Sequence, residues 1–124
     1  HGELLKARCN ACGIVRDCHD DLSIADSCTA CGRDGQMRPH VVWFGEMPLG
    51  LEQAYGALEN ATHFAAIGTS GTVSPASNFV RSAAYEGAHT VYVNLTPMDP
   101  PNPAFRQTVL GRAEEVLPAL LGVE

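Results

Sequence analysis

Four cysteines in two short hooks are the residues whose type and spacing most directly indicate chemistry. Residues 9–12 read Cys-Asn-Ala-Cys, residues 28–31 read Cys-Thr-Ala-Cys, and fifteen residues separate the two hooks. A C-x-x-C turn brings two thiolates to one side of a metal ion, and two such turns complete a tetrahedral site. A glycine follows each hook and can adopt a positive φ, which frees backbone amides for the sulfurs. The spacing predicts a structural metal site with four ligands: Cys9, Cys12, Cys28 and Cys31.

Other uses of these cysteines are less favoured. Two disulfides would leave Cys18 unpaired, and the chain shows no sign of a secretory leader. Zinc is the commoner occupant of a closed four-sulfur site, but iron in a rubredoxin-like site uses the same hooks and stays open as an alternative. Cys18 and His19 lie between the hooks, outside any C-x-x-C pattern, and we interpret them as loop residues.

The elements that would position further chemistry begin after the second hook. Short apolar runs at residues 41–44, 64–67 and 90–93 predict buried strands. Apolar residues recur at helical spacing between residues 50 and 60 and again from residue 76 to 87. Ser74-Pro75 predicts the N-cap and first turn of the second helix. A last helix is expected within residues 113–121, where Pro118 predicts a late start.

This order of elements predicts an α/β fold in which helices cover a parallel sheet. Ligands of such sheets bind at the carboxyl ends of the strands. Three loops should lie there, at residues 45–46, 68–72 and 94–96, while the four prolines of residues 97–103 predict an irregular loop. The Gly-Thr-Ser-Gly-Thr loop at 68–72 suits a phosphate or a ribose, although the same composition is common in plain turns.

Size and charge restrict the class of protein. With 124 residues, 45% of them hydrophobic, the chain can bury one modest core with the metal module as an appendage. The apolar run at 41–44 is far shorter than the roughly 20 residues that span a bilayer, so we expect a cytoplasmic protein without membrane contact. The net charge is −6, and residues 41–124 carry three basic against eight acidic side chains, which argues against a nucleic-acid partner.

Six sequence strings in this order resemble the sirtuins, the NAD-dependent protein-lysine deacylases, and most of all the bacterial desuccinylase-like class. The strings cover essentially the whole chain: residues 1–4 (His-Gly-Glu-Leu), both cysteine hooks, 38–46 (Arg-Pro-His-Val-Val-Trp-Phe-Gly-Glu), 67–73 (Ile-Gly-Thr-Ser-Gly-Thr-Val), 87–88 (Gly-Ala) and 93–95 (Val-Asn-Leu). The resemblance implies a zinc-binding module over residues 1–38. It also implies that residues 39–124 are the C-terminal part of a Rossmann-like NAD-binding domain.

The resemblance further implies ligand contacts, residue by residue. An acyl-lysine peptide would pair as an added strand with Val42, Trp43, Phe44, Gly45 and Glu46. The NAD site would be lined by Gly68, Thr69 and Ser70. Its adenosine ribose would meet Asn94, Leu95 and Thr96, with Ala113 near the adenine. The implied reaction transfers the acyl group to ADP-ribose and releases nicotinamide, so that NAD is consumed.

No residue of this chain is expected to be the catalytic base. The family's glycine-rich nucleotide loop, its catalytic histidine and the residues that read acidic acyl groups would precede residue 1, so we expect a truncated chain that is inactive alone. His40, His63 and His89 are interpreted as structural residues near strand ends. Ser74 departs from the family, which often has a larger residue there.

Two functions from other classes remain as alternatives. A zinc-stabilised module could bind peptides along residues 44–46 without catalysis, and its peptide affinity would be indifferent to NAD. A rubredoxin-like electron carrier would hold iron and have a reversible one-electron potential. The second alternative leaves the last eighty or so residues without a purpose.

Overall fold

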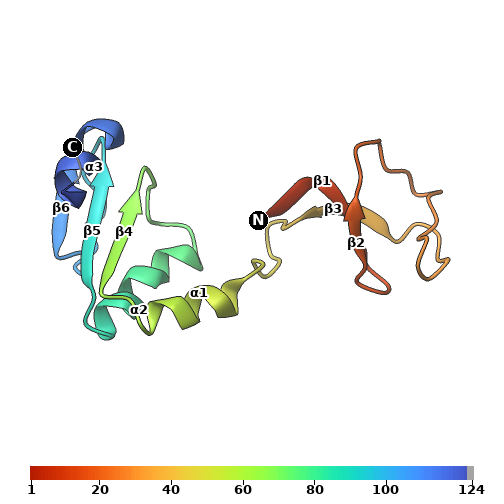
Figure 1. Ribbon diagram of the computed structural model, residues 1–124, viewed down its shortest axis with the longest axis horizontal. Coiled ribbons are helices and arrows are strands. Elements are labelled where there is room, and N and C mark those ends of the chain that lie inside the picture. The colour runs from red at the N-terminus through yellow and green to blue at the C-terminus, as the bar shows by residue number, and fades with distance from the viewer. Residues whose placement is uncertain (123–124) are drawn as a thin grey trace. The chain divides into compact units, whose positions relative to one another are not determined.

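The computed structural model describes residues 1–122 of the chain. Its internal contacts divide the chain into two compact units, His1–Leu51 and Glu52–Glu124. The first unit holds both cysteine hooks, and the second holds a parallel sheet with its helices (Figure 1).

The first unit is built on a small antiparallel sheet. Its strands are β1 (Gly2–Cys9), β2 (Val15–Asp17) and β3 (Met37–Val41), in the order β2-β1-β3. The buried core of this unit consists of Ala7, Cys9, Cys28 and Met37, so two of the predicted metal ligands are also core residues. The sheet thus places the first hook at the end of its central strand.

The strand predicted at residues 41–44 is wrong in both extent and partner. Strand β3 ends at Val41 and pairs antiparallel with β1 instead of joining the parallel sheet. Beyond it the chain turns at Gly45, leaving Trp43 more than half exposed and Phe44 fully exposed. A β-branched and aromatic run indicates a strand locally, but it does not say which sheet receives it or where the strand ends.

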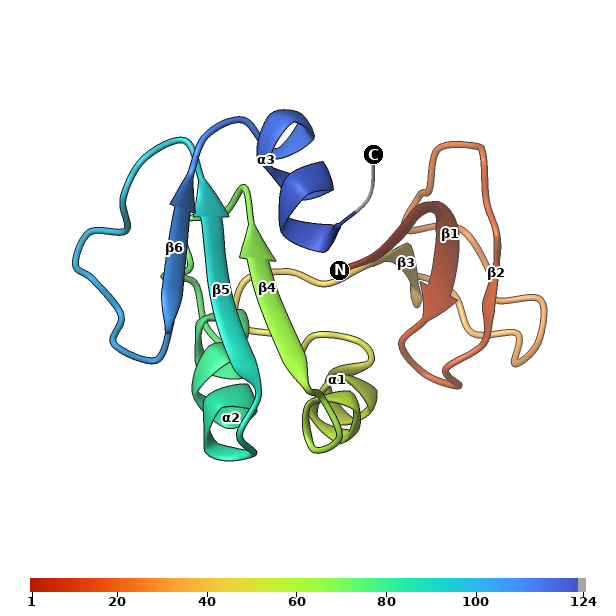
Figure 2. The ribbon, with the colours of Figure 1, turned by 60° about the vertical axis from the view of Figure 1, so that its left-hand side comes forward.

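The second unit contains the predicted parallel sheet, with strands β4 (His63–Ile67), β5 (His89–Asn94) and β6 (Gln107–Leu110) in the order β4-β5-β6. Both pairings are parallel, and four consecutive residues of the central strand β5 are buried, from residue 90 to 93. Figure 2 shows the three arrows side by side and pointing the same way. The predicted α/β fold with a parallel sheet is therefore confirmed.

The third parallel strand, β6, was not predicted. It is the third strand of the parallel sheet, a role that the sequence pattern assigned to residues 41–44. Only Val109 of its four residues is even partly buried, because β6 lies at the edge of the sheet. Strand β6 therefore lacks the continuous apolar run by which buried strands are recognised.

The helices follow the predicted order with two corrections. Helix α1 (Leu51–Leu58) lies where predicted. Helix α2 (Phe79–Tyr85) begins after a 3₁₀ turn, η1 (Ala76–Asn78), and the predicted cap at Ser74 is wrong. The hydroxyl of Ser74 lies 3.2 Å from that of Ser77 and caps no backbone amide. Leu58 of α1 and Ala83 of α2 are buried in one core cluster of this unit.

Helix α3 (Ala113–Leu121) contains Pro118 and does not start late as predicted. Arg112 is its N-cap residue, and its carbonyl accepts the amides of Glu115 at 3.0 Å and Val116 at 3.1 Å. Proline removes its own amide from the hydrogen-bond ladder and its ring crowds the carbonyl four residues earlier, but the amides of Glu115 and Val116 can still donate, so the first turn forms. Gly122 ends the helix with a φ of 68°.

The helices of the described residues are short. They comprise eight residues in α1, seven in α2 and nine in α3. A helix that crosses a bilayer needs about 20 apolar residues. Within residues 1–122 no helix has the length and apolar character to cross a membrane.

Candidate functional site

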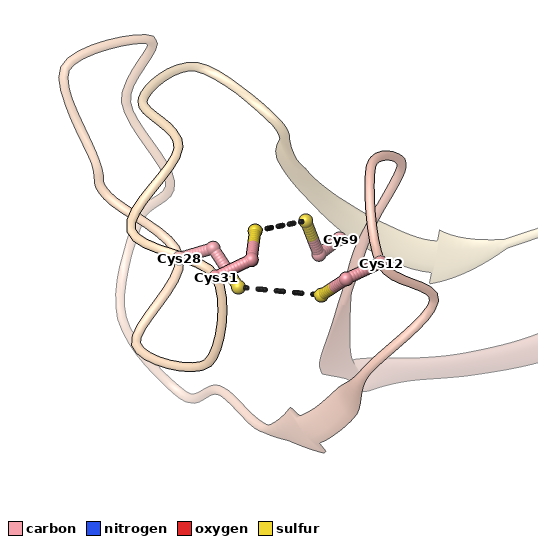
Figure 3. Close-up of side chains that lie close together, drawn as sticks. All are labelled: Cys9, Cys12, Cys28 and Cys31. Atoms are coloured by element: carbon pink, nitrogen blue, oxygen red, sulfur yellow. Dashed lines mark hydrogen bonds between the residues drawn. The ribbon is translucent and has the colours of Figure 1, made fainter.

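The four hook cysteines converge on one point. Their sulfurs all lie within 4.8 Å of one another, with Cys9 and Cys31 3.8 Å apart and Cys12 and Cys28 3.7 Å apart. Figure 3 shows the side chains of the two hooks pointing toward each other. A disulfide would need about 2.05 Å, whereas a tetrahedron with zinc–sulfur bonds of about 2.3 Å has sulfurs roughly 3.8 Å apart. The four sulfurs are therefore spaced to bind one metal ion.

The backbone of each hook explains this convergence. Gly13 and Gly32 follow the hooks with φ of 77° and 70°, the left-handed region that side-chain-bearing residues rarely adopt. Their amides donate to the carbonyls of Cys9 at 2.9 Å and Cys28 at 2.7 Å, closing both turns. A Cβ at either glycine would meet nothing within 4 Å, so the backbone angle rather than space requires glycine.

Electrostatics at the cluster favour a bound cation. Hydrogen bonds from the amides of Cys31 and then Ala30 lower the pKa of Cys28 to about 6. The Ile14 amide acts in the same direction on Cys12, but desolvation and the three neighbouring thiols raise the pKa of Cys12 to about 11. Four thiolates this close repel one another unless a metal ion neutralises them. Of the residues described, Cys18 stays outside the group, and its sulfur lies 3.5 Å from the carbonyl oxygen of Asp20.

The second candidate site lies at the carboxyl ends of β4 and β5. The Tyr92 hydroxyl donates to the Thr69 carbonyl at 2.8 Å, and the Asn94 side-chain amide donates to the same oxygen at 3.1 Å. The Gly68 amide donates to the carbonyl of Val93 at 3.0 Å. These bonds bring together two loops that lie 25 residues apart in sequence.

Asn94 also connects this edge to the start of α3. Its side-chain oxygen accepts the Leu95 amide at 2.9 Å, and its carbonyl accepts the Gly111 amide at 3.0 Å, two residues before Ala113. Figure 2 shows the chain leaving the tip of the β6 arrow and passing above the tip of β5 before α3 begins. The seven residues expected to contact NAD thus lie on three segments that follow neighbouring strands: Gly68, Thr69, Ser70, Asn94, Leu95, Thr96 and Ala113.

The loop at residues 68–72 is a compact polar turn. The Thr69 hydroxyl accepts the Gly71 amide at 3.1 Å, and the hydroxyls of Ser70 and Thr72 are 2.9 Å apart. A Cβ at Gly71 would come within 2.5 Å of the methyl carbon of Met98, so the following loop packs directly on this glycine. Met98 covers the backbone at Gly71, whereas a Cβ at Gly68 would meet nothing within 4 Å. The loop therefore offers hydroxyls and, at Gly68, an open backbone, which are the groups that hold phosphates and riboses.

Residues 42–46, the segment expected to bind a peptide, end in a turn that the side chain of Glu46 stabilises. Glu46 accepts the Trp43 amide at 3.0 Å and the Arg8 guanidinium at 3.3 Å, and it forms an ion pair with Arg38. Hydrogen bonding from Arg38, then from the Trp43 amide, holds the pKa of Glu46 below its ordinary value of 4.5. Arg8 and Glu46 lie 38 positions apart in sequence, and no local sequence signal indicates that they pair, so their contact was not predicted.

Comparison with known proteins decides the family. The model of the Sir2 family matches residues 1–75, well over half of the chain. The chain belongs to the Sir2 family.

Two bacterial relatives show the extent of the similarity. The chain is 50% identical over 118 residues to the NAD-dependent protein deacylase of Escherichia coli strain K12, a match that covers 95% of this chain and 42% of that protein. It is 46% identical over 121 residues to the NAD-dependent protein deacylase of Pasteurella multocida, covering 98% of this chain and 51% of that protein. The chain therefore spans about half or less of the curated sirtuins it matches.

Solved Sir2 structures show the same fold. A Sir2 homologue in complex with ADP-ribose matches with a TM-score of 0.78 at 29% identity, covering 98% of this chain and 49% of that chain. A Sir2 homologue in complex with NAD matches with a TM-score of 0.77 at 30% identity, covering 98% and 48%. The Rossmann-like α/β fold expected from the sirtuin resemblance is thereby confirmed.

Two histidines of this sirtuin chain lie at the opposite end of the parallel sheet from the loops at its carboxyl edge. His63 and His89 are paired at the amino ends of β4 and β5, opposite the carboxyl-end loops. A nitrogen of each ring has a neighbour, the Thr62 hydroxyl 3.1 Å from His63 and the Gln107 side-chain oxygen 3.1 Å from His89. His40 lies in β3, where its Nδ1 is buried with no partner. The candidate site residues thus form three groups that contain no histidine: the cysteine cluster, the carboxyl-end loops and the turn at Glu46.

Proposed function

We propose that this chain is the C-terminal portion of an NAD-dependent protein-lysine deacylase, which transfers the acyl group of an acyl-lysine to ADP-ribose and releases nicotinamide. Membership of the Sir2 family is the observation that carries this proposal. The names of the bacterial relatives and the complexes of Sir2 homologues with NAD and ADP-ribose support it. The cysteine cluster holds one structural ion, for which zinc is the best candidate.

The carboxyl-end loops form the NAD site in this proposal. Gly68, Thr69 and Ser70 approach the nucleotide from one loop, and the segment 94–96 meets the adenosine ribose from the next. The shared hydrogen bonds at the Thr69 carbonyl support this assignment, because they hold both loops in place before a ligand arrives. Bound NAD supplies an electrophilic ribose carbon, and these residues orient it.

Residues 42–46 form the peptide site in this proposal. The backbone of an extended peptide pairs with this segment. In this mode main-chain hydrogen bonds provide the affinity, so there is little selectivity for the peptide's sequence. A Sir2 structure bound to a myristoylated histone peptide, at 28% identity and a TM-score of 0.68, supports an acylated-peptide partner. The exposed ring of Phe44 adds apolar surface for an acyl-lysine side chain.

None of the described histidines is assigned as the general base in this proposal. The reaction needs a base for a ribose hydroxyl, and His63 and His89 lie at the opposite strand ends from the proposed NAD loops. Residues 1–124 alone are therefore expected to be inactive. We also propose a reducing, cytoplasmic setting and no nucleic-acid partner, in keeping with five unpaired cysteines and the acidic net charge.

The proposal is tested by measuring nicotinamide release from NAD in the presence of acyl-lysine peptides. The protein is compared in two forms, as residues 1–124 alone and within its full coding region. Release that requires both NAD and the peptide in the longer form, and is absent from the shorter form, is expected. A longer form that consumes no NAD with any acyl-lysine peptide would contradict the proposal.

A second candidate is a peptide-binding module without catalysis. The exposure of Trp43 and Phe44 favours peptide contact under either function. The two are separated by measuring peptide affinity with and without NAD, because ligands of one active site depend on each other and a separate module is indifferent to NAD.

A further inference from the structure

Two arginines face each other in the sheet of the first unit. In the ladder between β1 and β3, Arg8 lies directly opposite Arg38, and the next pair along is Cys9 opposite Met37. Both side chains are largely buried, with exposed fractions of 24% and 12%. Like charges directly opposite in a sheet destabilise it. The sheet beside the metal cluster therefore needs an anion at this position.

Glu46 supplies that anion from the following turn. One carboxylate oxygen accepts Arg8 and Arg38, each at 3.3 Å, and also the Trp43 amide at 3.0 Å. The other oxygen pairs with Arg38 as well. The bidentate contact with Arg38 is the stronger, charge-assisted kind of hydrogen bond. Glu46 thus neutralises both arginines and closes the turn at residues 43–46 against the sheet.

Arg38 also holds the aromatic side of the turn. Its guanidinium carbon lies 3.6 Å from the centre of the Trp43 ring, a cation–π contact. Its Nη2 donates to the carbonyl of Val41 at 3.1 Å, at the last residue of β3. A single side chain therefore contacts the strand end, the indole and the carboxylate.

We propose that Arg8, Arg38 and Glu46 act as positioning residues, here called the Glu46 clamp, which hold the turn at 43–46 in one conformation and couple it to the metal site. The coupling runs along β1, because Arg8 immediately precedes the metal-cluster residue Cys9. Metal binding fixes the end of β1 and with it the guanidinium that Glu46 needs. The use of this turn for peptide binding rests on the proposed function, whereas the coupling itself does not.

The clamp differs from an ordinary surface ion pair on the same strand. Lys6 and Glu3 also form a bridge in β1, at 2.9 Å, but their side chains are 35% and 63% exposed. Such exposed pairs contribute little, because water screens them and both side chains lose freedom. Glu3→Gln therefore serves as a matched control for Glu46→Gln, since each removes one carboxylate charge from the same unit.

The test measures two quantities in the absence of NAD and peptide. Metal affinity is measured by competition with a chromophoric chelator, and exposure of the indole is measured by acrylamide quenching of Trp43, the single tryptophan of the chain. Glu46→Gln is expected to weaken metal binding by about tenfold, because coupling between two sites is reciprocal. It should also raise Trp43 quenching in the metal-loaded protein, whereas Glu3→Gln should change neither quantity.

Arg38→Lys keeps the test decisive if Glu46→Gln binds no metal at all. Lysine retains the charge but lacks the planar fork and the stacking surface, so quenching should rise while one metal ion is still bound. The clamp proposal is overturned if Arg38→Lys has the same Trp43 quenching and metal affinity as the unsubstituted chain. Where Glu46→Gln also binds metal, the same must hold for that variant. That result would leave the deacylase proposal intact. Conversely, a longer protein without deacylase activity whose variants show the expected changes in quenching and metal affinity would contradict the deacylase proposal and support the clamp.

Discussion

At the scale of single residues, the cysteine cluster is the most demanding feature of the chain. Four thiols within 4.8 Å of one another cannot all ionise without a cation, as the opposite pKa shifts of Cys28 and Cys12 indicate. With a metal bound, the same sulfurs become the strongest cross-link in the first unit. Each of the four is needed, because a tetrahedral structural site has no spare ligand.

Replacing Cys28 by serine is expected to abolish stoichiometric metal binding and unfold the first unit. The reason is that metal binding supplies roughly 10 kcal/mol of folding free energy in sites of this type. Metal content measured by elemental analysis and unfolding followed by circular dichroism check this expectation. Cys18→Ser is the matched control and should retain one ion, since Cys18 lies outside the cluster. Loss of metal in both variants would contradict the assignment of ligands.

The pH dependence of stability should carry a contribution from Glu46. Its folded-state pKa lies below the ordinary 4.5, so the carboxylate stabilises the fold above that pH. This contribution is lost as the pH falls below 4.5 and through the lowered pKa. Denaturant unfolding between about pH 7 and pH 3 should therefore show a steeper acid loss in the unsubstituted chain than in Glu46→Gln. Parallel pH profiles of the two proteins would contradict the prediction.

At the scale of elements, the carboxyl end of β5 organises the proposed NAD site. Tyr92 is buried in the middle of this strand, yet its hydroxyl reaches the loop after β4. Asn94 closes the same strand and joins three segments through its side chain and its carbonyl. A central strand with neighbours on both sides is the natural place for such contacts, since it is the most firmly held element of the sheet.

Tyr92→Phe removes a hydroxyl that donates to the Thr69 carbonyl and accepts the Asn94 side-chain amide. It is expected to lower the free energy of unfolding by about 1–2 kcal/mol, since a buried hydrogen bond contributes about 1 kcal/mol net. It should also weaken NAD binding in the longer protein, because the Thr69 carbonyl loses a donor and the loop at 68–72 loosens. Chemical denaturation and calorimetric titration measure the two effects. Tyr85→Phe is the control, since Tyr85 is 88% exposed. Equal effects of both substitutions would argue against the role given to Tyr92.

At the scale of the whole molecule, stability comes from different sources in the two units. The first unit has a small core that includes two of the four metal-cluster cysteines. The second unit relies on apolar burial around β5 and between its helices and sheet. The two units should therefore respond differently to removal of the metal.

A strong metal chelator is expected to melt the first unit and spare the second. Hydrogen exchange followed residue by residue would show this, with amides of β1 and β3 losing protection while those of β5 retain it. The physical reason is that β5 is buried by side chains and needs no ion, whereas Cys9 and Cys28 sit in a core that the metal completes. Simultaneous loss of protection in β1 and β5 would show that the units fold as one.

The sequence alone determined the features that depend on local spacing. Two C-x-x-C hooks with following glycines were enough to predict the four-sulfur cluster, and the apolar periodicity was enough to predict α1, β4 and β5. The ordered strings were enough to recognise the sirtuin family. These features succeed because hook geometry and helix or strand period are properties of a few consecutive residues.

Only the tertiary structure decided which partner each segment meets. Residues 41–44 are strand-forming types, but nothing local says that the strand at this point is β3 (Met37–Val41), which joins β1 in an antiparallel sheet, while the weakly patterned β6 completes the parallel one. The contacts of Arg8 with Glu46 likewise span 38 positions and follow from the pairing of β1 with β3. Strand partners and long-range ion pairs depend on the competition among all surfaces of the folded chain, which a local pattern does not contain.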